Sequence, residues 1–215
     1  TELQADSRIK YARDFGNPVR ASNIAGSLCE YELITWTADD AVYLPNSLNN
    51  MVGVYEEMDS LINVVVAKYY EGEEGAHKPL QDDRYFKVNG AGINLYKIPD
   101  NYWLYNVALM SSRHFRELGY WDIDFESTWP AHTDMAIRSQ NLGALVRMSL
   151  SPALNCGHMP GETGDHKPIH DAHITHDVPQ LQQKWGGKTR LAADNRKPCV
   201  SDWKNSERVW NRRFK

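Results

Sequence analysis

The sequence predicts an α/β domain in which a mixed sheet is flanked by helices. The main observation is that short β-branched and apolar runs, at residues 32–36, 62–67 and 144–148, alternate with segments whose apolar residues recur at helical spacing. Composition is the second observation, because 41% of the 215 residues are apolar and 24% are charged, as in a water-soluble domain with a sizeable core. Strands that alternate with helices in this way indicate helices packed on the faces of a sheet.

The charge balance and the cysteines limit the classes of function. The net charge is −4 at pH 7, from 24 basic and 28 acidic residues, so we expect neither nucleic-acid binding by bulk charge nor attachment to an anionic membrane. No apolar run approaches the roughly 20 residues that span a bilayer, so no transmembrane segment is expected. Cys29, Cys156 and Cys199 are far apart and lack metal-type spacing, which favours a reducing compartment and predicts a cytoplasmic protein.

The N-terminal third is predicted to carry a strand that ends in an acidic turn. A helix rich in small residues is expected over residues 20–28, and residues 32–36 form a buried strand that runs into Asp39 and Asp40. A further helix opens at residues 45–46. Two adjacent carboxylates therefore lie at the C-terminal end of a strand, where ligands bind in open α/β sheets. Hard oxygen ligands there suit a divalent metal that carries phosphates, and a solvated turn is the structural alternative.

The middle of the chain continues the alternation. Residues 62–67 are predicted to form a second buried strand, and residues 102–110 are predicted to be extended. A short helix over residues 113–118 follows, capped by the preceding serines and closed by Gly119. This pattern indicates a second strand-to-helix connection.

The second informative stretch is the acidic loop 119–126, which precedes a predicted helix over residues 133–143. Thr133 is a suitable N-cap, and Gly143 is suited to end the helix. Asp134 then lies in the first turn, where the helix dipole favours a carboxylate. A structural role is therefore available to Asp134. A strand over residues 144–148 is predicted next.

The C-terminal region is rich in histidine and tryptophan. Five of the eight histidines lie within residues 156–176, namely His158, His166, His170, His173 and His176. Any one of them alone is more typical of a surface or core residue than of a metal ligand. The tail contains Trp185, Trp203 and Trp210 and is predicted to form one or two surface helices.

From about residue 20 to residue 176 the chain resembles a family 2-type glycosyltransferase of the GT-A fold. Three signatures occur in the order and spacing of that family. The first is the small-residue helix at 20–26, and the second is the strand and acidic turn ending at Thr37-Ala38-Asp39-Asp40, with Leu44-Pro45 after it. The third is the segment 115–126, which leads to the helix start at 133–138. It implies a GT-A-like catalytic domain over residues 1–176, with a C-terminal helical extension over residues 177–215 packed on it.

The resemblance also implies an activity. Such enzymes move a sugar from a nucleotide-diphosphate donor to a carbohydrate or glycoconjugate hydroxyl, as in polysaccharide biosynthesis, and require Mn²⁺ or Mg²⁺. The physical reasons are that a departing diphosphate gains charge that a cation can stabilise, and that an acceptor hydroxyl needs a group to take its proton. We therefore expect a metal-dependent hexosyltransferase.

The implied site residues fall into groups by role. The metal ligands are Asp39, supported by Asp40, and a histidine from the C-terminal region, for which His158 is the first choice with His166 and His170 behind it. Imidazole together with carboxylate suits Mn²⁺ better than Ca²⁺. The resemblance implies that Arg20 and Asn23 bind the donor diphosphate and that Trp121 and Asp122 bind the acceptor. It also implies that Asp134 and Asp122 are the catalytic carboxylates.

The chain departs from the family pattern at particular positions. Thr37 stands where the family has an aspartate, and Ala131-His132 stands where the family has a Glu-Asp pair, which leaves Asp134 as the nearest carboxylate. The strand–helix–strand unit that recognises the nucleotide base has no counterpart before Arg20. We therefore expect an unfinished sheet edge near the N-terminus, which a second copy or a partner chain could complete.

Each of these assignments has an alternative. Helix capping explains Asp134, core packing explains Trp121, and a simple helix start explains Arg20 and Asn23. The alternative functions are a metal-dependent hydrolase that uses the Asp39–Asp40 turn with the histidines, and a non-catalytic GT-A-like binding module.

Overall fold

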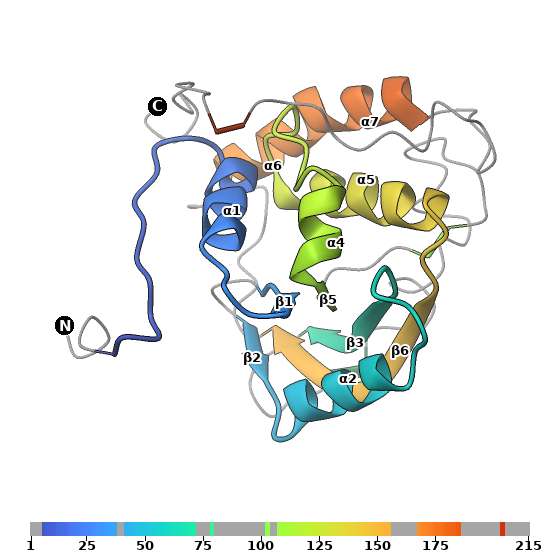
Figure 1. Cartoon of the computed structure of the whole chain (residues 1–215). Coiled ribbons are helices and arrows are strands. Elements are labelled where there is room, and N and C mark those ends of the chain that lie inside the picture. The colour runs from blue at the N-terminus through green and yellow to red at the C-terminus, as the bar shows by residue number, and fades with distance from the viewer. Residues whose placement is uncertain are drawn as a thin grey trace.

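The structure is a computed structural model that describes residues 6–37, 41–71, 78–79, 102–103, 107–155, 167–185 and 203–204. It confirms the predicted α/β architecture, with one mixed sheet between layers of helices (Figure 1). Within the segment 102–110, which is predicted to be extended, residues 104–106 lie outside the described residues.

The elements of the described residues have the following bounds. The helices are α1 (Pro18–Ser27), α2 (Ser47–Glu56), α4 (Ser112–Glu117), α5 (Thr128–Asn141), α6 (Lys167–Ala172) and α7 (Val178–Trp185), with the π-helical turn η3 (His173–Asp177) between α6 and α7. The strands are β1 (Leu33–Thr35), β2 (Ala41–Tyr43), β3 (Val64–Glu71), β4 (Lys78–Pro79), β5 (Ala108–Ser111) and β6 (Val146–Asn155).

The sheet has the strand order β1-β5-β3-β6-β2, and β4 pairs with β3 off this path. The long central strands β3 and β6 are parallel, whereas the β1/β5, β5/β3 and β2/β6 pairs are antiparallel. The edge strands β1 and β2 are joined by a side chain, because the Tyr43 hydroxyl lies 2.9 Å from Thr35 Oγ1 and donates to the Trp36 carbonyl at 3.2 Å. The sheet therefore curves so that its two edges approach each other.

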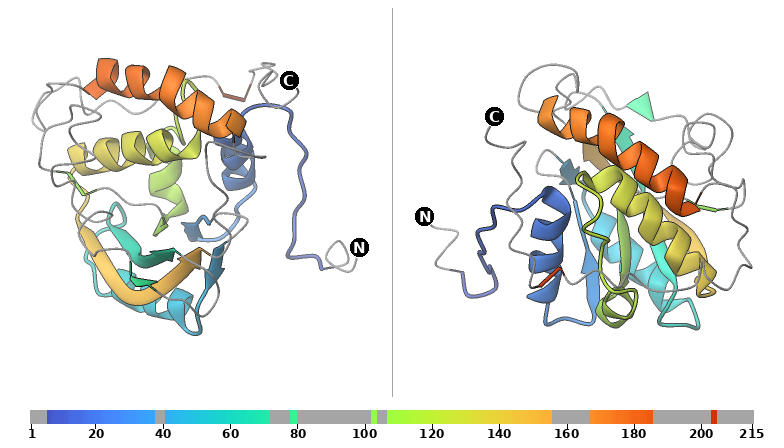
Figure 2. Two further views of the ribbon diagram at one scale, coloured as in Figure 1. Left: turned by 180° about the vertical axis from the view of Figure 1, so that it is seen from behind. Right: turned by 90° about the horizontal axis from the view of Figure 1, so that it is seen from above.

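Alternating side chains of the strands build a core on each face of the sheet. Val64, Val66 and Met110 pack with α1, α4, α5 and α7 in the larger core, and Val65 and Leu109 pack with α2 in the smaller one. Figures 1 and 2 show this arrangement, with α2 alone on one face and the other helices on the opposite face. The near-continuous apolar run of β3 is thus explained by burial on both faces.

Side-chain caps explain where α1 and α4 begin. The Asn17 side chain accepts a hydrogen bond from the Arg20 amide at 2.8 Å, and the Ser111 hydroxyl accepts one from the His114 amide at 2.9 Å. The helix end predicted at Gly119 is confirmed, since this glycine has a φ of 78°. The serine cap predicted before α4 is therefore confirmed, whereas α1 begins two residues earlier than the predicted position 20.

The predicted start of α5 is wrong. The helix begins at Thr128, so Thr133 is not its N-cap and Asp134 lies in its second turn. The end at Gly143, with a φ of 96°, is as expected. The prediction of β1 as a buried strand is also wrong, because β1 is an edge strand and its residues are only half-buried. The short strand β2 was not predicted.

The boundary expected between residues 176 and 177 falls inside a continuous helical stretch formed by α6, η3 and α7. Asp177 is itself fully buried. The helix α7 lies alongside α5 (Figure 2). In the part of the chain that the structure describes, no helix is long and apolar enough to cross a membrane.

The outer edge of β1 carries no strand partner among the described residues. The Ser112 amide donates to the Glu32 carbonyl at 2.8 Å, and hydrogen-bonded pairs alternate along an antiparallel ladder. The Ile34 amide therefore points toward β5, while the amides of Leu33 and Thr35 point to the outer edge.

This alternation predicts an amide-exchange pattern. In hydrogen–deuterium exchange read out by NMR, we expect slow exchange at Ile34 and fast exchange at Leu33 and Thr35 in a dilute sample. Slow exchange at all three positions would contradict an open edge. Protection of Leu33 and Thr35 that appears only as protein concentration rises would identify a second copy as the partner.

Candidate functional site

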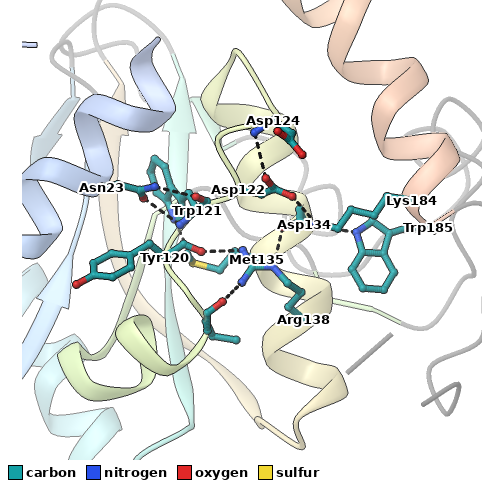
Figure 3. A network of polar contacts seen from close by, with 11 residues as sticks. Asn23, Tyr120, Trp121, Asp122, Asp124, Asp134, Met135, Arg138, Lys184 and Trp185 are labelled. Atoms are coloured by element: carbon teal, nitrogen blue, oxygen red, sulfur yellow. Dashed lines mark hydrogen bonds and ion pairs between the residues drawn. The ribbon is translucent and has the colours of Figure 1, made fainter. Parts of the chain in front are cut away.

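The loop that joins α4 to α5, residues 118–127, lies where helices from three parts of the chain meet. We call it the α4–α5 loop. It contains Trp121 and Asp122, and its backbone is held by side chains from α1, α5 and η3. Its Asp122 side chain is paired with Lys184 of α7 (Figure 3). Because so much of the chain contributes to holding it, this loop is a fixed part of the molecule.

The side chain of Arg138 connects α5 to the start of the loop. Its guanidinium donates to the carbonyls of Leu118 and, at 2.8 Å, Tyr120. Its Nε donates to Asp134 Oδ2 at 2.7 Å, one helical turn away. Both side chains are essentially fully buried, with exposures of 1% and 0%. Asp134 thus holds Arg138 in the orientation in which it reaches the loop.

The other oxygen of Asp134 is occupied by α7. Its Oδ1 accepts a hydrogen bond from Trp185 Nε1 at 2.8 Å and lies 2.7 Å from Lys184 Nζ. The same ammonium donates to Asp122 Oδ2 at 2.6 Å, and Asp122 Oδ1 accepts from the Asp124 amide. Lys184 therefore bridges α5 and the α4–α5 loop, as Figure 3 shows.

These charges keep one another ionised. Burial by itself raises the pKa of Asp134, but Arg138 and Lys184 outweigh it and hold the pKa below its ordinary value. Burial likewise acts to lower the pKa of Lys184, and Asp134 and Asp122 outweigh it and raise that pKa. The network is thus a set of permanent ion pairs at physiological pH.

Two asparagines and an aspartate hold the rest of the loop. Asn23 of α1 donates to the Trp121 carbonyl at 2.8 Å and accepts from the Trp121 amide at 2.9 Å, and Asn17 donates to the Phe125 carbonyl. Asp177 of η3 accepts from the amides of Glu126 and Ser127 and from the Ser127 hydroxyl. Asp177 therefore satisfies backbone donors immediately before α5.

An aromatic cluster joins the end of β1 to this loop and to α5. The rings of Trp36 and Trp121 meet edge to face with centroids 5.4 Å apart. The His132 ring lies 5.7 Å from Trp36 and 4.6 Å from Trp121. Trp36 directly precedes the acidic turn, so the contacts place His132 and Trp121 beside the strand that leads to Asp39 and Asp40.

The positions of the expected metal ligands can be given only through their neighbours. Asp39, Asp40 and His158 lie outside the described residues. Ala41, which follows Asp40, is paired with Asn155 in the antiparallel β2/β6 ladder. Paired residues lie about 4.5–5.5 Å apart, so the chain enters β2 and leaves β6 at the same end. Among the described residues no group of three or more His, Cys, Asp and Glu side chains could hold a metal.

The structure gives the other expected site residues structural contacts. Arg20 is paired with Asp14 and donates to the Trp203 carbonyl. Asn23 is fully buried with both amide atoms bonded to the Trp121 backbone. Asp122 and Asp134 are both paired with Lys184. The donor-binding and catalytic roles of these four residues stay predictions, and their contacts favour positioning roles.

Sequence reasoning missed the partners of these residues. The i, i+4 spacing of Asp134 and Arg138 is a signal that could have revealed their pair once the helix was recognised. Lys184 and Trp185 come from a distant part of the chain, and no local pattern indicated where they dock. His132 was noticed only as a departure from a family pattern.

The first prediction from this site concerns Asp134→Asn. The change leaves Arg138 buried without its carboxylate, so we expect a loss of about 3–5 kcal/mol in the free energy of unfolding. Chemical denaturation at pH 7 measures it. Asp124→Asn, a loss of the same charge at an exposed position of the same loop, is the matched control and should change stability by less than about 0.5 kcal/mol. A cost below about 1 kcal/mol for Asp134→Asn, as for a helix-terminal charge, would contradict the ion-pair role.

The second prediction concerns buried histidines. Burial lowers the pKa of His114 and His173 to about 4 and that of His132 to about 3. These folded-state pKa values lie below the pKa of histidine in the unfolded chain. The contribution of the neutral histidines to the free energy of unfolding is therefore fully present above about pH 6.5 and is lost as the pH falls toward the folded-state pKa values.

Each histidine should steepen the loss of stability by about 1.4 kcal/mol per pH unit between about pH 6 and pH 4.5. His173→Phe keeps an aromatic ring against Trp129, which stacks on His173 at 4.4 Å, and removes one such contribution. Denaturation curves across this pH range would show a shallower dependence for the variant. Equal slopes would contradict a depressed pKa at His173.

Neither a protein-family model nor a curated protein sequence matches this chain. The functional assignment therefore rests on the residues and their geometry. Within the described residues, that geometry consists of the held α4–α5 loop and the aromatic cluster beside the end of β1.

Proposed function

We propose that the protein is a metal-dependent glycosyltransferase with a GT-A-like fold, which transfers a hexose from a nucleotide-diphosphate sugar to a carbohydrate or glycoconjugate hydroxyl. The observation that carries the proposal is the pairing of Ala41 with Asn155. It brings the chain that follows Asp40 beside the chain that precedes His158. Residues that are more than a hundred positions apart in sequence are thereby led to one end of the sheet.

The donor set fits a divalent cation that carries phosphates. Two carboxylates and an imidazole are a mixed oxygen and nitrogen set, which suits Mn²⁺ and also accommodates Mg²⁺ through the carboxylates. In our proposal Asp39 and Asp40 hold the cation, with His158 as the further ligand. When bound, the cation would neutralise charge on the departing diphosphate.

The segments before and after the acidic turn contact each other. The Tyr43 hydroxyl contacts Thr35 and the Trp36 carbonyl before the turn, while Tyr43 lies in β2 after it. A turn whose two ends are joined in this way is better suited to binding a ligand than a freely moving loop, because less ordering is needed on binding. This contact therefore supports a binding role for the Asp39–Asp40 turn.

The acceptor side is assigned to the α4–α5 loop and the start of α5. Trp121 is buried against Trp36 and His132, and its indole Nε1 donates to the Met135 sulfur at 3.1 Å. Its role in our proposal is to form the wall of the acceptor site and to keep its shape. Asp122 and Lys184 support that wall through their ion pair.

A second candidate is a nucleotide-sugar-binding module that lacks transferase activity. The observation that favours it is the engagement of both predicted catalytic carboxylates, Asp122 and Asp134, with Lys184. Neither is positioned to accept a proton without losing an ion pair. Binding without turnover would identify this second function, and hydrolysis of substrates other than sugar nucleotides would identify a hydrolase.

The test is metal-dependent nucleotide binding measured by calorimetry. We expect UDP or GDP to bind in the presence of Mn²⁺, and Asp39→Ala to weaken that binding by at least about tenfold because a charged metal ligand is lost. Asp59→Ala is the matched control, since Asp59 is an exposed acidic residue that follows α2.

The control should bind as the wild type does. Both variants should keep the wild-type unfolding temperature, because Asp59 is exposed and Asp39 is predicted to lie in a turn and not in the core. Equal Mn²⁺-dependent affinity in the wild type and Asp39→Ala would overturn the assignment of the turn. Absence of any nucleotide binding by the wild type would overturn the proposed function.

A further inference from the structure

His132 is a buried polar residue whose hydrogen-bonding groups are unused. Its side chain is 5% exposed, and among the described residues neither ring nitrogen has a hydrogen-bond partner. Another buried histidine, His114, also has an Nδ1 without a partner, but its Nε2 lies 2.9 Å from the Ser139 hydroxyl. In the part of the chain that the structure describes, His132 is thus the buried histidine that lacks a partner at both ring nitrogens.

This arrangement is costly for the folded protein. A neutral imidazole has one N–H donor and one lone-pair acceptor, and each buried group without a partner costs roughly 1–3 kcal/mol. A phenylalanine would fill an aromatic environment between Trp36 and Trp121 without that cost. A buried polar group that is left unsatisfied calls for an explanation, and a bound ligand is one of the explanations that apply at functional sites.

The position of His132 indicates which ligand group could satisfy it. The ring contacts Trp36, which precedes the Asp39–Asp40 turn, and Trp121, which we assign to the acceptor wall. On the assumption that the proposed function is correct, a sugar hydroxyl bound between the turn and the loop would face this ring. Asp134, two residues further along α5, has both oxygens occupied.

We propose that His132, and not Asp134 or Asp122, takes the proton from the acceptor hydroxyl. The hydroxyl oxygen forms the new bond to the anomeric carbon of the donor sugar as its proton moves to the ring nitrogen of His132. The bond from the anomeric carbon to the diphosphate breaks, and its electron pair leaves with the diphosphate. This assignment rests on the proposed glycosyl transfer.

The charge state of the ring agrees with this role. Burial lowers the pKa of His132 to about 3, so the imidazole is neutral near pH 7 and one nitrogen keeps a lone pair. A base of that pKa is weak, and a negatively charged diphosphate bound nearby would raise it toward the range in which imidazole is effective. Base strength would therefore be acquired on donor binding.

Access to the ring depends on Trp36. The ring nitrogens are covered, and of the two tryptophans Trp36 is the half-buried one while Trp121 is 2% exposed. A hydroxyl would reach His132 from the Trp36 side, after the indole turns aside.

The experiment compares His132→Phe and His132→Asp with the wild type, using a panel of UDP- and GDP-sugars with Mn²⁺ and measuring release of the nucleoside diphosphate. We expect His132→Phe to lower turnover by about 10²-fold or more while affinity for the nucleoside diphosphate is unchanged. The unfolding temperature of this variant should equal or exceed that of the wild type. His132→Asp should recover turnover to within about tenfold, because a carboxylate can accept the same proton.

His114→Leu is the control for the loss of a buried histidine, and it should lower stability without lowering turnover below its unfolding temperature. Wild-type turnover in His132→Phe would overturn the proposal, and so would a loss explained by weaker nucleotide binding. A wild type that binds neither nucleotide would overturn both this proposal and the proposed function.

If the wild type binds nucleotide but releases no product from the panel, the ring ¹⁵N signals of His132 decide the question. We expect a higher ring pKa in the protein bound to UDP and Mg²⁺ than in the free protein. An unchanged pKa would overturn the proposal while leaving nucleotide binding intact.

Discussion

The buried carboxylate of Asp134 is the constraint on which the helical layer depends. A charge removed from water is tolerated only when it is paired and hydrogen-bonded, and Asp134 obtains this from Arg138, Lys184 and Trp185. Such a network need not add much net stability, but it allows only one arrangement of α5, α7 and the α4–α5 loop. The same contacts that fix the loop leave Asp134 poorly suited to exchange protons during a reaction.

In the proposed function, positioning and proton transfer are thereby assigned to different residues. Ion pairs and asparagine side chains hold the α4–α5 loop. Trp121 of this loop packs edge to face against Trp36, which follows β1. The β2/β6 pairing independently brings Ala41, which follows Asp40 in sequence, beside Asn155 at one end of the sheet. The His132 ring contacts both Trp36 and Trp121, and among the described residues its nitrogens have no hydrogen-bond partner. The loop side of this cluster is held in place, whereas Trp36 must move before a ligand can reach the ring.

The sequence predicted what local physics determines. Strand character at β1 and β3, the serine cap of α4 and the glycine at the end of α5 follow from patterns of a few neighbouring residues. The start of α5 was missed because it is stabilised by a distant residue. The amide of its N-cap, Ser127, donates to the side chain of Asp177, fifty positions later in the sequence. The same reason explains why the partners of Asp134 were missed: Lys184 and Trp185 reach it only through tertiary packing. Burial of charge cannot be read from a pattern in which an aspartate suits a helix start equally well.

The most direct test of the account is the location of a bound metal. A crystal of the protein grown with UDP and Mn²⁺ would show the manganese by its anomalous scattering. The account predicts one ion at the end of β1, held by the residues between Thr37 and Ala41 and lying on the side of the sheet where β6 ends. A manganese ion bound elsewhere, or none at a concentration that saturates nucleotide binding, would contradict it.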